Sequence, residues 1–169
     1  MIKKMMFFYL LLTSSHAFSA APEIVQIHYR GTVVIPPYTI ATPFASVNFG
    51  NIIAADFASS SAATDWKELD INLTDCVGVT SFTISVSAPV STANPAYIGS
   101  TGTAEHIGIE GAAILETDTP IYNGVVIARN TGGELSQTIP LKFRLHNDDS
   151  GEATTGTVSS TVTLTYAFQ

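Results

Sequence analysis

The side chains that could do acid–base, nucleophilic or metal chemistry are scattered along this chain. His28, His106 and His146 lie in separate segments, without the spacing of metal ligands. The pair Asp148 and Asp149 lacks the alternating oxygen ligands of a calcium loop. Residues 98–102 contain glycine and serine but fail the G-x-S-x-G spacing of a nucleophile elbow. The sequence therefore favours a structural or binding protein over an enzyme, and it implies no metal or cofactor.

The first 20 residues have the features of a secretory signal peptide. Lys3 and Lys4 form a positive start, residues 5–12 form a short apolar run, and small residues follow. We predict cleavage between Ala17 and Ala21. The apolar run is shorter than the roughly 20 residues that a membrane span needs, and no later stretch could cross a bilayer. We therefore expect an exported mature chain without a membrane span.

The composition of the mature chain excludes several classes of partner. Without the two leader lysines, five basic residues remain against fourteen acidic ones, which gives a net charge of about −9. Nucleic acid and anionic membrane surfaces are not expected partners at that charge. Cys76 is the only cysteine, which is unusual in an oxidising compartment. We interpret it as a buried thiol that packs as a small apolar side chain rather than as a reactive group.

Residues 24–35 form the most regular extended stretch of the sequence. Apolar and polar residues alternate, which is the pattern of a strand with one apolar face. Pro36 and Pro37 end the stretch, because proline cannot donate to a ladder. Gly31 interrupts the apolar face, where a glycine weakens a strand unless another backbone must approach it closely. The apolar face consists of Val25, Ile27, Tyr29, Gly31 and Val33.

The remainder of the chain reads as short strands separated by turn residues. The turns lie at 130–133 and 147–151, a loop at 91–103, and a helical turn at 54–58. Such regular short strands predict an all-β fold, an antiparallel immunoglobulin-like sandwich in one domain. The last strand is unusual because it runs to the end of the chain, where termini normally fray. The predicted strands are 38–40, 47–53, 66–76, 82–86, 107–113, 125–127, 137–145 and 158–168, with Leu69, Ile71, Leu73, Phe82, Ile84 and Val86 facing the core.

Six sequence segments, in their order and spacing, resemble one family across the whole mature chain. These segments are residues 30–40, 47–52, 69–76, 101–104, 139–145 and 164–169. The family is the subunits of chaperone–usher pili, the fimbriae of Gram-negative bacteria. The N-terminal part is most similar to a minor tip subunit of P pili, and the middle is similar to tip subunits of type 1 pili.

The resemblance implies an incomplete immunoglobulin-like sandwich that lacks its last strand. Residues 1–20 are then the signal peptide, residues 21–35 an N-terminal donor-strand extension, and residues 36–169 the pilin domain. The extension inserts its apolar face, Val25 to Val33, into the open groove of a neighbouring subunit, and Gly31 meets a shallow pocket there. The residues implied to border the groove and to bind the chaperone are Val162, Leu164, Tyr166, Phe168 and Gln169.

The resemblance also implies partners, a location and a role. The partners are a periplasmic pilus chaperone, an outer-membrane usher and neighbouring pilus subunits, and the location is an extracellular fimbrium reached through the periplasm. We predict a minor or tip-adaptor subunit in cell adhesion. The alternatives are a major rod pilin, or a single-domain glycan-binding adhesin that uses exposed aromatic residues such as Tyr97 or Tyr122.

One departure from the family concerns its usual disulfide. The second cysteine of that disulfide corresponds to Cys76, but Tyr38 occupies the position of the first, so the crosslink cannot form. Loss of a native disulfide typically costs about 2–5 kcal/mol. We expect either tighter packing of Tyr38 or a greater dependence on the chaperone and on neighbouring subunits.

Overall fold

The computed structural model describes residues 38–169, so the predicted signal peptide and donor-strand extension lie outside the described part. The described part consists of eight strands and one short 3₁₀ helix. The elements are β1 (Thr39–Ile40), η1 (Ala54–Phe57), β2 (Lys67–Thr74), β3 (Ser81–Ser87), β4 (Ile107–Ala113), β5 (Thr119–Ile121), β6 (Val126–Asn130), β7 (Gln137–Asn147) and β8 (Thr163–Phe168).

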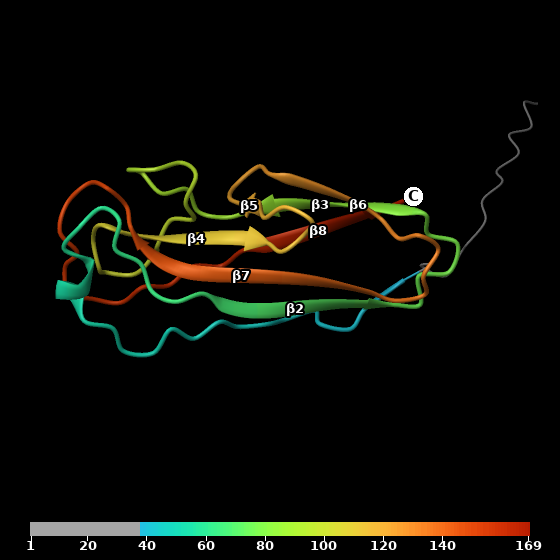
Figure 1. The fold of residues 1–169 in the computed structure, drawn as a ribbon, viewed down its shortest axis with the longest axis horizontal. Coiled ribbons are helices and arrows are strands. Elements are labelled where there is room, and N and C mark those ends of the chain that lie inside the picture. The colour runs from blue at the N-terminus through green and yellow to red at the C-terminus, as the bar shows by residue number, and fades with distance from the viewer. Residues whose placement is uncertain (1–37) are drawn as a thin grey trace, which may run out of the picture. The chain divides into compact units, whose positions relative to one another are not determined.

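The strands form two antiparallel sheets. One sheet has the order β1-β2-β7-β4-β5 and the other the order β6-β3-β8. In Figure 1, β7 lies between β2 and β4, as this order requires. The burial of β7 alternates along the strand, as expected for the middle strand of this sheet. Ile139, Leu141 and Phe143 are buried, while the residues between them are half-buried on the opposite face.

The core lies between the two sheets. Leu73 and Ile139 from one sheet and Ile84 from the other are at most 1% exposed. The predicted core face of β2 is confirmed, with Ile71 and Leu73 buried and Leu69 packed against them at half burial. The predicted core residues of β3 are confirmed as well, and they are Phe82, Ile84 and Val86. The predicted helical turn at 54–58 is confirmed by η1.

Two predicted strand segments are wrong. Residues 47–53 form no strand, and the last strand begins at Thr163 rather than at Val158. Both segments carry alternating side chains, but a strand also needs a neighbouring backbone with which to form a ladder. Residues 157–159 instead bond to a loop, through Thr101 N–H to Ser159 O at 2.7 Å and Ala104 N–H to Thr157 O at 3.0 Å.

The strands on either side of the turn at 130–133 are not neighbours in one sheet. β6 pairs with β3, whereas β7 pairs with β2 and β4. The turn therefore carries the chain from one sheet to the other instead of closing a hairpin. The sequence prediction also missed β5, because it is three residues long and Pro120 lies at its centre.

Close backbone contact fixes the segment that leads into β8. A Cβ atom added to Gly102 would lie 1.9 Å from the carbonyl oxygen of Thr157. Only glycine lets residues 101–104 approach the chain before β8 so closely. This contact positions residues 157–159 at one side of the open groove described below.

Tyr38 joins the start of the described chain to its end. Its ring stacks on the ring of Phe168, with centroids 3.4 Å apart and an interplanar angle of 19°. Phe168 also lies against Phe82 of β3, with ring centroids 5.7 Å apart. The stack connects the residue before β1 with β8, and β1 and β8 lie in different sheets.

We predict that Tyr38→Ala lowers the free energy of unfolding by about 1–2 kcal/mol, because it removes an aromatic pair together with part of its buried area. Tyr38→Phe keeps the ring and should change the free energy by less than about 0.5 kcal/mol. Urea unfolding of the mature chain measures both values. Equal losses in the two variants would contradict a role for ring stacking.

Cys76 is a free thiol with 1% of its surface exposed. Burial raises the pKa of this thiol, and the nearby carboxylate of Asp75 raises it further. The reactive thiolate is therefore scarce at neutral pH, and the sulfur is also shielded from reagents.

We predict that Cys76 reacts with a thiol reagent such as DTNB much more slowly in the native chain than in urea. The unfolded chain supplies the matched control, since its only cysteine is then accessible. Rapid native labelling at neutral pH, with no loss of structure, would contradict the burial of this side chain.

Candidate functional site

The outer edge of β8 has no neighbouring strand among the described residues. β8 is the last strand of its sheet and pairs with β3 alone. Gln169 and Ser81 exchange two backbone hydrogen bonds, of 2.9 and 3.2 Å. In an antiparallel ladder such pairs alternate, so the N–H and C=O groups of Leu164, Tyr166 and Phe168 point toward the free edge. These groups are available to another strand.

A groove with a volume of about 620 Å³ opens beside this edge. Its floor comes from the core face of the five-stranded sheet and from Ile98. One side consists of residues between Ile40 and Phe49, and the other side of residues between Val158 and Tyr166. The floor residues are Leu69, Ile71, Ile98, Ile109, Leu141 and Phe143. An apolar floor between two separated backbone segments suits an extended peptide with alternating apolar side chains.

The incomplete burial of β8 shows that its sheet lacks a strand beside it within the described residues. No residue of β8 is fully buried: its inward side chains are half-buried, and the outward ones between them are exposed. In β3, the paired strand, Phe82 and Ile84 are each 1% exposed. Burial raises the pKa of the half-buried Tyr166, so its phenol stays neutral in the groove wall.

The predicted groove residues fall into two groups in the structure. Val162, Leu164 and Tyr166 line the groove. Phe168 lies beyond its end, covered by the ring of Tyr38. The carbonyl oxygen of Gln169 accepts hydrogen bonds from the Thr80 N–H at 2.8 Å, the Thr80 hydroxyl at 3.2 Å and the Ser81 N–H at 3.2 Å. The predicted inserting residues, Val25 to Val33, lie outside the described residues.

The side of the groove opposite β8 was not identified from the sequence. Phe44 is 94% exposed at this side, and Val47 and Phe49 are half-buried there. The alternation of residues 47–53 predicts a strand and does not distinguish a strand from a groove wall. Phe44 could have indicated this side, because it lies between Pro43 and a stretch of small residues and has no apolar neighbour to pack against in its own segment.

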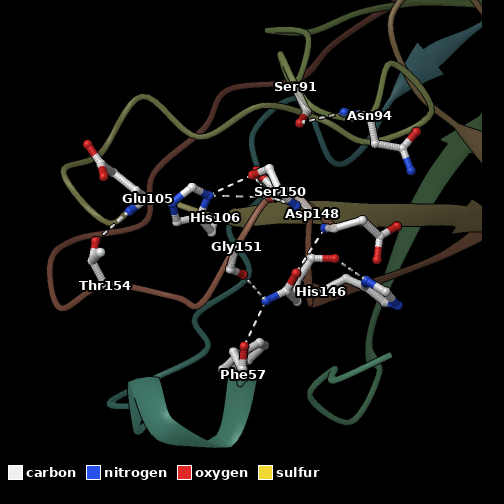
Figure 2. Close-up of polar contacts among 12 residues, drawn as sticks. Phe57, Ser91, Asn94, Glu105, His106, His146, Asp148, Ser150, Gly151 and Thr154 are labelled. Atoms are coloured by element: carbon white, nitrogen blue, oxygen red, sulfur yellow. Dashed lines mark hydrogen bonds and ion pairs between the residues drawn. The ribbon is translucent and has the colours of Figure 1, made fainter. Parts of the chain in front are cut away.

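A separate polar cluster lies where β7 ends, and Figure 2 shows its contacts. His106 Nδ1 lies 2.6 Å from the Ser150 hydroxyl and 3.9 Å from a carboxylate oxygen of Asp148. A catalytic triad needs the serine at one ring nitrogen and the carboxylate at the other. Here Nδ1 makes both contacts, and the Ser150 hydroxyl itself donates to Asp148. The cluster therefore lacks the arrangement of a nucleophilic site.

Asn147 gives this cluster a structural function. Its side chain is almost fully buried, and its amide donates to the carbonyl oxygens of Phe57 and Gly151 at 2.7 and 2.8 Å. Its own oxygen accepts from the Asp149 N–H at 2.8 Å. These bonds attach η1 and the turn after β7 to one buried side chain (Figure 2).

Residues 38–169 contain neither a candidate metal site nor a candidate membrane-spanning helix. No group of three histidine, cysteine or acidic side chains in this part of the chain is placed to hold a metal ion. No helix there is long and apolar enough to cross a membrane.

Within residues 38–169, the open groove and the free β8 edge define an incomplete immunoglobulin-like sandwich, as the family resemblance implied. The fimbrial-like protein YdeR of Escherichia coli K12 is 32% identical to this chain over 168 residues, which cover 95% of this chain and 96% of YdeR. This chain belongs to the fimbrial proteins, the subunits of chaperone–usher pili. No protein-family model matches the chain.

Two further relatives are fimbrial proteins by name. Protein FimG of Escherichia coli K12 is 29% identical over 148 residues, covering 85% of this chain and 84% of FimG. The S-fimbrial adhesin protein SfaS of Escherichia coli O6:K15:H31 strain 536 is 27% identical over 152 residues, covering 90% of each chain.

Solved structures share the fold at low sequence identity. A subunit in the structure of a chaperone–usher pilus matches with a TM-score of 0.67 and 16% identity, over 90% of this chain and 100% of that one. The P pilus rod subunit PapA matches with a TM-score of 0.65 and 13% identity, over 79% of this chain and 100% of PapA.

Proposed function

We propose that this chain is a structural subunit that joins its neighbours by donor-strand exchange, as a minor or tip-proximal adaptor of the fimbria. The observation that carries the proposal is the free β8 edge beside the apolar groove. A strand from a neighbouring subunit would pair with the backbone of Leu164 and Tyr166. Its alternate side chains would cover the groove floor.

The donor segment in this proposal is the N-terminal extension, residues 21–35, exposed after removal of residues 1–20. Val25, Ile27, Tyr29 and Val33 would enter the groove of the next subunit, while Gly31 would leave room for close backbone approach. Burial of four large side chains contributes on the order of 6–12 kcal/mol before ordering costs. Such a contact can hold a fibre together without covalent links.

The same groove explains the partners proposed for assembly. Until a neighbour arrives, the free edge and apolar floor would be open to aggregation. A periplasmic chaperone would cover them, an outer-membrane usher would exchange the chaperone for the next subunit, and the fibre would extend outside the cell. The role is structural rather than enzymatic.

We predict that a labelled peptide copying residues 24–35 binds a purified neighbouring subunit of the same fimbria, as measured by fluorescence anisotropy. A peptide with Gly31→Leu should bind more than about tenfold more weakly, because an added side chain meets a shallow pocket. A peptide with Thr32→Leu is the matched control, because it carries the same new side chain on the outward face. Equal binding of the two altered peptides would contradict the proposed inserting face.

Variants of β8 test the groove from the other side. In the mature chain, Leu164→Asp should weaken the binding of a peptide that copies a neighbouring subunit's N-terminal extension more than about tenfold, because it places a charge at the groove wall. Thr165→Asp should have a small effect, because residue 165 is exposed on the opposite face of the same strand. A stable mature monomer that takes up no peptide copying the N-terminal extension of a neighbouring subunit would overturn donor-strand exchange for this chain.

Deletion of this chain separates the adaptor role from that of a major rod pilin. Electron microscopy of cells that lack it should still show fimbrial rods, because only loss of the major subunit removes the rod. Complete loss of rods, restored by the intact gene, would assign the chain to the rod instead.

A further inference from the structure

A second concave site lies on the outer face of the five-stranded sheet. It is a shallow cleft of about 230 Å³, and Trp66, Tyr97, Glu110, Ala112, Asp118 and Pro120 line it. These residues come from the chain before β2, the 91–103 loop, β4, and the segment around β5. The cleft shares no residue with the donor-strand groove, which faces the core side of the same sheet. Filling the groove therefore leaves the cleft open.

Small residues at the outer face of β4 create this hollow. Ala112 faces Pro120 in the ladder, and neither side chain extends far above the sheet. Beside them, Tyr97 covers Gly108, where an added Cβ would lie 3.0 Å from the tyrosine side chain. Tyr97 thus packs firmly on the sheet and forms a fixed wall of the cleft.

Trp66 is held on the same face by two cations from β7. Arg144 Cζ lies 4.4 Å and Lys142 Nζ 4.8 Å from the centroid of its ring. Trp66 is only half-buried, so part of the indole stays accessible. Cation–π contacts of this kind fix the orientation of the ring.

The charges around the cleft are paired. Arg144 Nε donates to Glu110 Oε2 at 2.6 Å, and Lys142 contacts the Asp118 carboxylate. Each of these two carboxylates is thus neutralised by a cation, and this pairing favours a neutral ligand over an ion. The phenol of Tyr97 also stays protonated, because burial and the carboxylates of Glu110 and Asp149 raise its pKa.

The ligand class follows from this combination. The volume is below the roughly 300–1,000 Å³ of sites for drug-sized ligands, which limits the occupant to about one ring. Aromatic walls favour a ring with a flat C–H face. Carboxylate acceptors beside ammonium, guanidinium and phenol donors favour hydroxyl groups, which both donate and accept. A neutral sugar residue meets all of these requirements.

We propose that this cleft binds a terminal neutral sugar residue of a glycan, with the sugar ring against Trp66 and Tyr97 and its hydroxyls bonded to Glu110 and Asp118. The inference adds a binding role to the structural one and does not depend on donor-strand exchange. It also assigns a site to Tyr97, whereas Tyr122 does not line this cleft.

Trp66 provides a direct test, because it is the only tryptophan in the chain. Its fluorescence emission in the mature chain is measured while methyl glycosides of glucose, galactose, mannose, N-acetylglucosamine and N-acetylgalactosamine are added separately. We expect a saturable change with at least one of them. A glycan array with the same protein should then show binding to glycans that end in that sugar.

Variants assign the signal to the cleft. Glu110→Gln and Tyr97→Phe should each weaken binding about tenfold, the effect of losing one good hydrogen bond to a charged or buried partner. Asp118→Asn serves as a second carboxylate variant if the loss of the Arg144 pair disturbs folding. Glu68→Gln, an exposed carboxylate of β2 outside the cleft, is the matched control.

Three results would overturn the proposal. In the first, none of the five glycosides causes a saturable emission change, and the protein binds no glycan on the array. The second is binding to sialylated or sulfated glycans only, which would contradict a neutral ligand. The third is binding that the two cleft variants leave unchanged. None of these results bears on peptide uptake by the donor-strand groove, so failure of one proposal does not imply failure of the other.

Discussion

The unpaired edge of β8 is the constraint on which the rest of this domain depends. A sandwich core is complete only when both sheets cover each other along their whole width, and within residues 38–169 the three-stranded sheet ends at β8. The inward side chains of β8 therefore remain half-buried, although those of β3 beside it are buried. The apolar surface left uncovered and the unpaired backbone groups occur at the same place. A single added strand would satisfy both.

The open side must still hold its shape, and noncovalent contacts supply that rigidity. Residues 101–104 pack against 157–159 through backbone bonds and the close approach at Gly102. The Tyr38–Phe168 stack closes the other end of the groove and connects the two sheets. The family resemblance implies a cysteine at the position of Tyr38, and in the structure this residue makes an aromatic contact with Phe168. A stack restrains the folded state, whereas a disulfide also restrains the unfolded chain.

Side-chain alternation predicted the longer strands that have partners and failed where a partner is missing. β2, β3, β4 and β7 were found because each has one face against the core, which is a local property of the sequence. Residues 47–53 and 158–162 alternate in the same way, yet they border the groove and form no ladder. Whether a segment finds a neighbour depends on the whole fold. Family resemblance predicted the wall formed by β8, whereas neither resemblance nor periodicity predicted the opposite wall.

The outer cleft was beyond sequence reasoning for a related reason. Trp66, Tyr97, Glu110 and Asp118 lie far apart along the chain. The pairing of β2 and β4 with β7, of β5 with β4, and the bridge between Ile98 and Ile109 bring them together. The same alternation that directs Leu141 and Phe143 into the groove directs Lys142 and Arg144 outward to Trp66. One strand thus serves both surfaces with alternate residues. Because neighbouring residues on β7 belong to opposite faces, a substitution in the cleft can change surface binding without altering the groove floor, and assembly and recognition can vary independently in such a domain.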